Sequence, residues 1–199
     1  TNGSSNTAVG DSALLKNTSG SSNSALGNNS LYNNTTGTGN VAIGFESLFK
    51  VSTSGNNSAF GFEAAHENSS AGISAFGFKA LRQNTFGVSN SAFGNSAMIA
   101  NTTGNFNTAI GSFALTANTS GNSNSAIGDS ALIRNTIGSR NTSIGNNSLV
   151  ANTIGNSNSA IGFYTLAANS SGSFNSAVGD SALYLITSGT SNVAFGTSA

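Results

Sequence analysis

Few residues in this sequence have side chains that commonly perform chemistry. The pentapeptide Gly-Asp-Ser-Ala-Leu begins at Gly10, Gly128 and Gly179, and its serine would be a nucleophile only with a base beside it. The single histidine, His66, lies in a different part of the chain from each copy. Cysteine is absent, so the chain has no thiolate for a metal and no disulfide. We therefore expect no catalytic residue, no metal, no cofactor and no enzymatic activity.

The charge of the chain is low and balanced. Its 199 residues include six Lys or Arg and six Asp or Glu, so the formal net charge is zero. A neutral chain with few basic residues offers no electrostatic footprint for nucleic acid and no polybasic patch for a membrane. No apolar run approaches the roughly 20 residues that span a bilayer. We expect neither nucleic-acid binding nor direct membrane insertion.

A repeat of 17 residues organises the whole of residues 1–199 into a single repeat domain. The consensus is N-[ST]-A-I-G-x-x-A-L-x-x-N-T-x-G-x-x, and positions 1 to 17 are counted from its first Asn. The fourth copy is one residue shorter than the others. Eleven full copies begin at Asn6, Asn23, Asn40, Asn57, Ile73, Asn90, Asn107, Asn124, Asn141, Asn158 and Asn175, and a partial copy begins at Asn192.

Fixed columns of residue types predict an all-β fold, a parallel β-solenoid. Position 5 is always Gly, position 3 is Ala except for Ser143, and position 9 is Leu or Met except for Ala65. Such a short unit is typical of one solenoid coil, here with strands expected at positions 1–4 and 8–11. We expect Gly to end each strand with a positive φ. Coils stacked at about 4.8 Å would form a rod on the order of 50 Å long. The recurring Asn predicts a stacked amide ladder.

Two columns on opposite faces of the first strand suggest self-association. Position 4 is apolar in every copy, and strand alternation places the Ala column on the other face. We expect Ile127→Asp, in the apolar column, to unfold or split the rod, and Ser123→Asp, in a variable turn, to be tolerated. The flat Ala column from Ala8 to Ala194 would suit a second sheet, which predicts a parallel homotrimer. The sequence leaves open which column faces the partner chains.

Several segments carry a family resemblance. Residues 40–44 (Asn-Val-Ala-Ile-Gly) and 192–196 (Asn-Val-Ala-Phe-Gly) resemble the head repeats of trimeric autotransporter adhesins, and residues 107–121 are similar to repeats in trimeric phage and viral tail fibres and in bacterial surface fibres. The resemblance implies a left-handed β-roll, a homotrimer, and a fragment of a longer fibre protein. It also implies a structural and adhesive segment at the cell surface, extracellular or on a virion fibre, that binds a target cell through a surface glycan or protein.

One region departs from the repeat pattern, in copies three to five. Alignment of these copies places Glu63 near Lys79 and Lys50 near Glu67. One interpretation is a local packing variant, with surface ion pairs worth at most about 1 kcal/mol each. The other is a specific contact with a ligand or a partner subunit. The candidate contact residues are Phe45, Phe62, Phe78, His66 and Arg82.

An ice- or crystal-binding solenoid is the alternative function. A flat column of Thr hydroxyls that matches a lattice would carry it, and position 13 is rich in Thr, as at Thr18, Thr102 and Thr136. The next position is irregular, with Ser19, Thr103 and Ile137 in those copies. A lattice-matching face is expected to be more uniform, so the fibre function is favoured.

Overall fold

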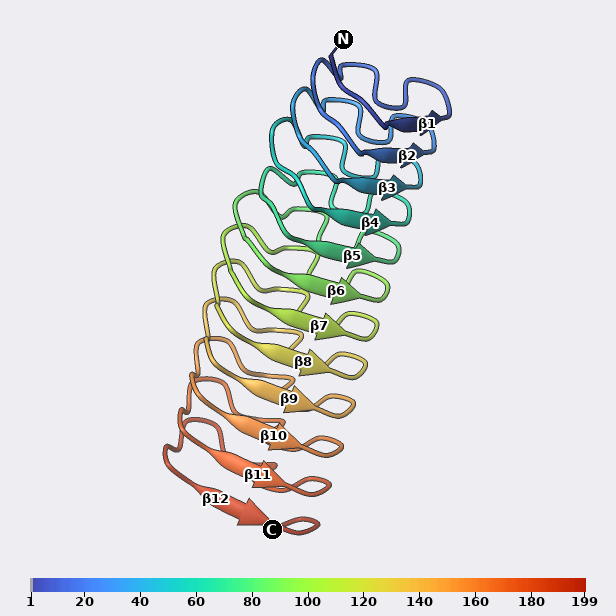
Figure 1. Ribbon diagram of the computed structural model, residues 1–199. Helices are drawn as coiled ribbons and strands as arrows, with labels where there is room; N and C mark the ends of the chain where they lie inside the picture. Colours follow the sequence, from blue (N-terminus) through green and yellow to red (C-terminus); the bar gives the residue numbers. More distant parts are fainter. Residues whose placement is uncertain (1) are drawn as a thin grey trace.

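Each repeat unit forms one coil that contributes one three-residue strand to a single sheet (Figure 1). The computed structural model describes residues 2–199, and within that range it contains no helix. The 12 strands pair in chain order and all in parallel, so the rod runs from the N-terminus at one end to the C-terminus at the other. The strands are β1 (Thr7–Val9), β2 (Ser24–Leu26), β3 (Val41–Ile43), β4 (Ser58–Phe60), β5 (Ser74–Phe76), β6 (Ser91–Phe93), β7 (Thr108–Ile110), β8 (Ser125–Ile127), β9 (Thr142–Ile144), β10 (Ser159–Ile161), β11 (Ser176–Val178) and β12 (Val193–Phe195). The predicted β-solenoid of 17-residue coils is confirmed.

The strands pair in register, so each residue lies against its equivalent in the next coil. Ala109 pairs with Ala126, and this pattern holds across the shortened fourth copy, where Ala59 pairs with Ala75. The residue that the fourth copy lacks is position 14, in the turn between Ser69 (position 13) and Ser70 (position 15), which lies outside the strand. A deletion in the turn therefore leaves the register of the sheet unchanged.

The predicted second strand at positions 8–11 is wrong. Positions 7 and 9 have left-handed backbone conformations, as at Phe113 (φ 56°) and Leu115 (φ 53°), so this segment is a run of turns. Its N–H groups still bond to the neighbouring coil, for example from Leu115 N to Ala131 O at 2.9 Å. A left-handed non-glycine residue costs roughly 1–2 kcal/mol. Inter-coil hydrogen bonds and burial of the Leu side chain offset that cost.

The Ala column lies inside the coil, so the expectation that it forms an outer face is wrong. Ala109, Ala114 and Leu115, at positions 3, 8 and 9, are fully buried against one another. The narrow interior of the coil holds the Ala methyl group of position 3 and the Leu side chain of position 9. Because side chains alternate along a strand, position 4 then faces outward. Ile110 and Ile127 are accordingly 41% and 37% exposed.

Position 4 thus forms an outward-facing apolar line along the whole rod, half-buried at Ile43, Phe60 and Phe76 and exposed elsewhere, which we call the aliphatic ridge. Its members come from every strand of the sheet, and in the single chain none of them belongs to the buried core. They are Val9, Leu26, Ile43, Phe60, Phe76, Phe93, Ile110, Ile127, Ile144, Ile161, Val178 and Phe195.

Two amide ladders lie side by side next to the apolar core, where the sequence predicted one. At position 1, Asn124 Nδ2 donates to Asn107 Oδ1 (3.2 Å) and to the carbonyl of Gly138 (2.8 Å). At position 12, Asn135 Nδ2 donates to Asn118 Oδ1 (2.9 Å) and to the same Gly138 carbonyl (2.9 Å). The ladders satisfy buried polar groups within the coil and join each coil to the next.

Substitutions in the position 12 ladder leave acceptors without donors. Val51 and Ile186 replace Asn there, and the amide oxygens of Asn34 and Asn169, one coil earlier, are buried without a hydrogen-bond partner. At position 1, Ile73 replaces Asn, although its backbone N–H still donates to Asn57 Oδ1 at 3.1 Å. Each ladder is therefore a sum of local bonds that tolerates single gaps.

Glycine recurs at positions 5 and 15 of the repeat for two different structural reasons. At position 5, Gly111 has φ +133°, a conformation that the sequence correctly anticipated. At position 15, Gly121 has no positive φ, so the same explanation fails there. A Cβ at Gly121 would collide with the carbonyl oxygen of Gly138 and with Asn118 Oδ1. Gly is favoured at position 15 because the ladders and the next coil fill the space around it, although Ser54 and Ser70 occupy this position in the third and fourth copies.

We predict that Asn135→Val lowers the free energy of unfolding by about 1–3 kcal/mol, the cost of leaving buried polar partners unpaired. The substitution reproduces Val51 at the same position and removes the donor from Asn118 Oδ1. Urea unfolding measures the change. The control is Asn122→Ser at position 16, where Ser139 and Ser173 occur naturally, and it should unfold like the wild type. Equal midpoints for the two variants would contradict a stabilising role of the ladder.

Candidate functional site

The three predicted phenylalanines form one exposed stack on the turn after the strands. Phe45, Phe62 and Phe78 occupy position 6 of consecutive coils, with ring centroids 5.1 and 5.5 Å apart. Each ring is between 41% and 47% exposed. Offset stacking covers one face of each ring and leaves its edge to solvent. The stack therefore presents a narrow apolar surface.

A second stack holds the predicted histidine. Tyr32, Phe49 and His66 occupy position 10 of consecutive coils, with centroids 5.3 and 5.0 Å apart. The His66 side chain is only 12% exposed. Arg82 follows at the same position in the next coil. The packing of His66 is thus explained by its neighbours in the column.

Charged side chains connect His66 to its surroundings. Its Nε2 lies 3.1 Å from Glu46 Oε2 and its Nδ1 lies 2.8 Å from Glu67 Oε1. Lys50 pairs with Glu67, as the alignment of the coils predicted. Two carboxylates therefore flank one imidazole ring and hold it in the plane of the stack.

The remaining predicted residues meet at Glu63. Its carboxylate pairs with Arg82 and lies 4.0 Å from Lys79 Nζ, the second ion pair that the alignment predicted. The Lys79 ammonium lies 4.9 Å from the centroid of Phe78 and 5.9 Å from that of Phe62. All five predicted contact residues thus belong to one continuous surface, which we call the aromatic–charged cluster: Phe45, Phe62, Phe78, His66, Arg82 and the ionised side chains among them.

A third stack belongs to the aliphatic ridge. Phe60, Phe76 and Phe93 lie at position 4, with centroids 4.6 and 4.8 Å apart. The sequence left open whether this column or the Ala column faces partner chains, and the prediction for Ile127→Asp treated this column as buried. Sequence reasoning missed Phe163, a further aromatic residue at position 6, which packs edge-to-face on Tyr164 at 4.4 Å. The sequence pattern alone does not show that position 4 faces outward.

The serine of the repeated pentapeptide has no base beside it. Ser130 Oγ lies 3.4 Å from the neighbouring carboxylate of Asp129, and both ring nitrogens of His66 contact glutamates. His66 lies four coils away from Ser130, roughly 19 Å at the strand spacing of a sheet. Within residues 2–199 no group of three or more His, Cys, Asp or Glu side chains is placed to bind a metal ion.

The Thr hydroxyls at position 13 are used inside the rod. Thr102 Oγ1 donates to the carbonyl of Thr119 (2.9 Å), and Thr119 Oγ1 donates to that of Thr136 (3.1 Å). A hydroxyl has one proton, so these groups have no donor left for a lattice of water. The observation weighs against the ice-binding alternative.

Two hollows lie on the end faces of the rod. One of about 520 Å³ is lined by Leu183, Tyr184 and Leu185, and another of about 430 Å³ is lined by Ala8, Leu14 and neighbouring residues. Both lie where a coil has no neighbour in the described chain. They expose the same side chains that pack between coils elsewhere.

No protein-family model, curated protein or solved structure matches this chain. Residues 2–199 contain no helix of the length and apolarity needed to cross a membrane. Arguments about function therefore rest on the surfaces of the rod and on the repeated residues themselves.

Glu67 gives the aromatic–charged cluster a predictable response to pH. Burial raises the pKa of Glu67, but hydrogen bonds from Lys50 and His66 outweigh it, so the pKa lies below its ordinary value of 4.5. A lowered pKa in the folded state contributes stability above pH 4.5, which is lost as the pH falls through the folded value. The contribution is small because the pair with Lys50 is largely exposed to solvent.

We predict that Glu67→Gln slightly lowers the free energy of unfolding at neutral pH and reduces its fall between about pH 5 and pH 3. Urea unfolding at several pH values measures both effects. Asp129→Asn is the control, because Asp129 forms no ion pair within residues 2–199. If the free energy of unfolding of Glu67→Gln falls with decreasing pH as steeply as that of the control and of the wild type, the ion pairs of Glu67 do not affect folding.

Proposed function

We propose that this chain is a structural and adhesive segment of a homotrimeric surface fibre, either a bacterial adhesin or a phage or viral tail fibre. The carrying observation is the aliphatic ridge, which runs along all 12 strands and is exposed in the single chain except at Ile43, Phe60 and Phe76, which are half-buried. Soluble monomers rarely expose so long a contiguous apolar surface. The ridge, rather than the buried Ala column, is the surface that partner chains would cover.

Three parallel chains satisfy the geometry of the ridge. Closed rotational symmetry brings identical surfaces together around one axis. With the axis along the rod, each coil meets the same coil of its partners, so the rings of Phe60, Phe76 and Phe93 meet their own copies. In a trimer each ridge would have two neighbouring ridges, whereas in a dimer it would have one. The similarity of the Asn-Val-Ala-Ile-Gly segments to trimeric adhesin heads supports the same number.

The aromatic–charged cluster is the proposed contact surface for an external target such as a surface glycan or protein. Its rings at position 6 lie beside the ridge on the turn that follows each strand and remain 41–47% exposed. Exposed aromatic rings bordered by charges suit recognition better than folding. Three copies in a trimer would bind a repetitive target with avidity. Such a fibre acts outside the cell or on a virion.

We predict that light scattering of the chain at micromolar concentration gives three times the chain mass of 19.7 kDa. The apolar ridge supplies the driving force, because removing its side chains from water is favourable. A monomer mass at this concentration contradicts the trimer and, with it, the proposed fibre.

We predict that Ile127→Asp yields a folded monomer, whereas Ala126→Asp unfolds the coil. Ile127 is 37% exposed in the single chain, so the charge stays hydrated until chains associate, but Ala126 is fully buried. We thus expect the position 4 column to determine assembly and the position 3 column to determine folding. Light scattering and circular dichroism separate the effects, and Ser123→Asp is the neutral control. An unfolded Ile127→Asp chain would show that the ridge is required within each coil.

We predict that simultaneous replacement of Phe45, Phe62 and Phe78 by Asn leaves the trimer mass unchanged. Asn occupies position 6 in other coils, as at Asn28 and Asn95, so the backbone accepts it. A loss of trimer mass would assign the three rings to the subunit interface and remove them from the proposed contact surface.

A further inference from the structure

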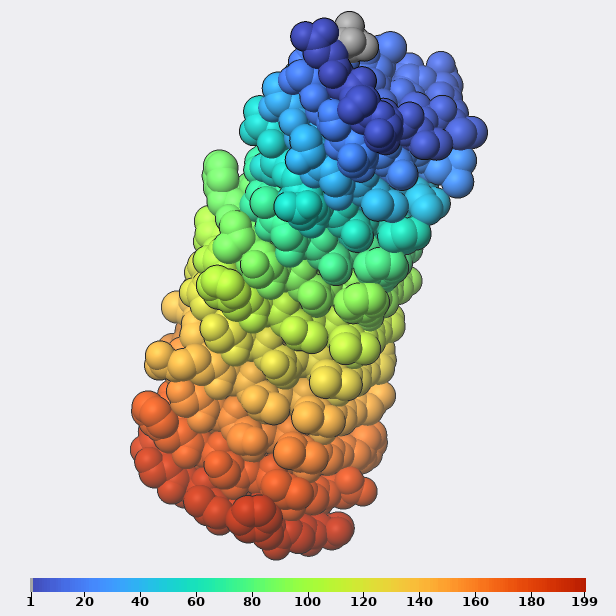
Figure 2. Space-filling view, viewed as in Figure 1, coloured from blue at the N-terminus to red at the C-terminus, as the bar shows by residue number. Residues whose placement is uncertain are grey.

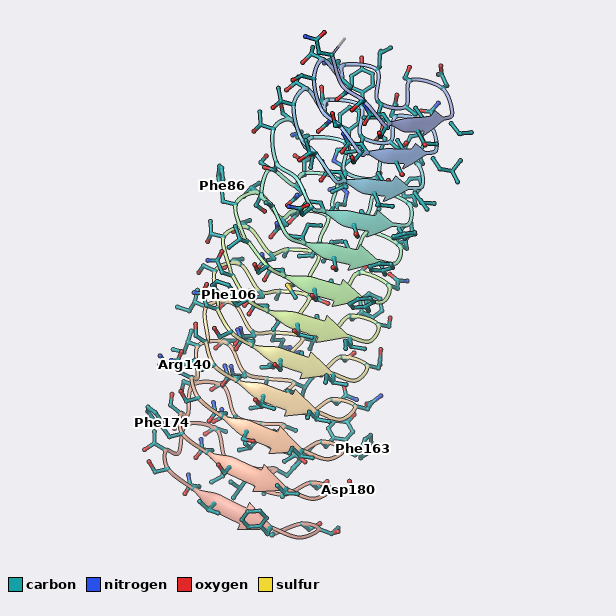
Figure 3. The ribbon with its side chains drawn as sticks, viewed as in Figure 1. Phe86, Phe106, Arg140, Phe163, Phe174 and Asp180 are labelled. Atoms are coloured by element: carbon teal, nitrogen blue, oxygen red, sulfur yellow. The ribbon has the colours of Figure 1, made fainter. Side chains whose placement is uncertain are left out.

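A second exposed apolar surface lies on the opposite long edge of the rod, in the turn formed by positions 14 to 17. Figure 3 shows Phe86, Phe106, Arg140 and Phe174 along this edge, across the rod from Phe163. We call these four residues, together with Ile137 and Ile154, the lateral strip. Phe86, Phe106 and Phe174 are 72%, 63% and 62% exposed, more than the rings of the aromatic–charged cluster.

The lateral strip occupies only part of the edge. In the first four copies, positions 14 and 17 hold small or polar residues; they are Ser19, Ser22, Thr36, Gly39, Thr53, Asn56 and Gly72. The fourth copy lacks position 14 altogether, and Phe86 follows in the next coil. In the space-filling view the green surface protrudes at this place on the edge (Figure 2). The shortened turn therefore marks the boundary between a polar and an aromatic half of the edge.

The coil gains nothing from the large side chains at position 17. Phe106, Arg140 and Phe174 have φ of 58°, 59° and 59°, a left-handed conformation that bulky residues rarely adopt. Ser123 and Ser157, in the intervening coils, are the common choice at this position. Because these serines have the same left-handed conformation (φ 55°), the coil forms without a ring at this position, and the two rings stay exposed to solvent.

The edge beneath the strip is rigid. Asn105 Oδ1 accepts from Val88 N (2.8 Å), and Asn122 Oδ1 accepts from Asn105 N (2.8 Å), so position 16 forms a third ladder along the turn. The backbone at position 17 also bonds between coils, as from Phe174 N to Asn156 O at 3.0 Å. A pre-organised surface loses little freedom when a ligand binds.

The spacing of the strip suits an extended ligand. Phe106, Arg140 and Phe174 lie two coils apart in succession, about 10 Å per step at the strand spacing of a sheet. Arg140 Nε donates to Ser157 Oγ (3.2 Å), which fixes the guanidinium across the edge. Arg140 forms no ion pair within residues 2–199. An unpaired guanidinium between two exposed rings is complementary to a carboxylate.

These features favour an acidic oligosaccharide over a peptide or a membrane. A pyranose ring has an apolar C–H face that stacks on an isolated aromatic ring, and its hydroxyls find partners among the Ser and Asn side chains of the edge. An extended peptide needs unpaired backbone groups to add to, and the backbone groups at positions 16 and 17 already bond between coils. A membrane surface requires a cluster of basic residues, whereas Arg140 is the single basic residue of the lateral strip.

We propose that the lateral strip binds a carboxylate-bearing oligosaccharide along the rod, with Phe106 and Phe174 as stacking platforms and Arg140 as the carboxylate receptor. The proposal rests on the adhesive function proposed above and assigns a class of target to a surface separate from the aromatic–charged cluster.

Titration calorimetry of the 199-residue chain with oligogalacturonate and with oligosialate tests the proposal. Binding of at least one of them by the wild type, weakened about tenfold or more by Phe106→Ser with Phe174→Ser, is the expected result. Ser occupies position 17 in the neighbouring coils, so this double variant is expected to fold. Phe113→Ser is the matched control, since Phe113 is a 43% exposed ring at position 7, where Ser12 and Ser130 occur, and it should bind like the wild type.

Two further arms isolate the charge. Arg140→Ser should bind oligogalacturonate and its methyl ester equally, because the ester keeps the sugar faces and removes the carboxylate, whereas the wild type should prefer the acid. A wild type that binds neither acidic oligosaccharide, that binds polyglutamate instead, or that binds unchanged in the double variant overturns the proposal. Light scattering of the same samples keeps the two proposals distinct, because a trimer without saccharide binding refutes only the strip.

Discussion

The carbonyl oxygen at position 15, which belongs to a glycine in most copies, is the acceptor that ties each coil together. At Gly138 it accepts one hydrogen bond from the position 1 amide of Asn124 and one from the position 12 amide of Asn135. The two amides come from distant parts of the coil's sequence and meet at this one acceptor, which closes the coil. A Cβ at Gly138 would collide with Asn135 Oδ1 and with the carbonyl oxygen of Gly155, so glycine fits at this place without a shift of its neighbours.

A coil closed by amides has little room for apolar side chains. The interior beside the ladders holds mostly Ala at positions 3 and 8 and Leu or Met at position 9, as in Ala109, Ala114 and Leu115. Position 4 faces away from this interior because side chains alternate along the strand, and position 17 lies in a turn, so Ile110 and Phe106 are exposed. The thin interior thus leaves many apolar side chains on the exterior, and their burial against another molecule would be favourable.

The sequence predicted the repeat, the coil, the need for Gly at position 5, the amide ladder and the two ion pairs, because each depends on residues that recur at one spacing. It did not predict which face of the strand is internal, since alternation defines two faces and the ladders decide between them. The left-handed Leu115 was also hidden, because Leu has no preference for that conformation. Phe163 and Phe106 were not predicted because each is a single aromatic residue at a variable position of a regular copy, and its exposure becomes evident only when the turns are placed in space.

The direction of the hydrogen bonds has a mechanical consequence. The bonds between coils, such as Leu115 N to Ala131 O, run along the rod. Tension applied at the two ends of one chain therefore loads them in series, and the coils separate one at a time. Each detached coil of 17 residues extends by on the order of 55 Å, against a stacked rise of about 4.8 Å. A single chain under load thus lengthens in steps and dissipates energy, and in the proposed trimer the aliphatic ridge would provide the lateral attachment through which parallel chains share the force.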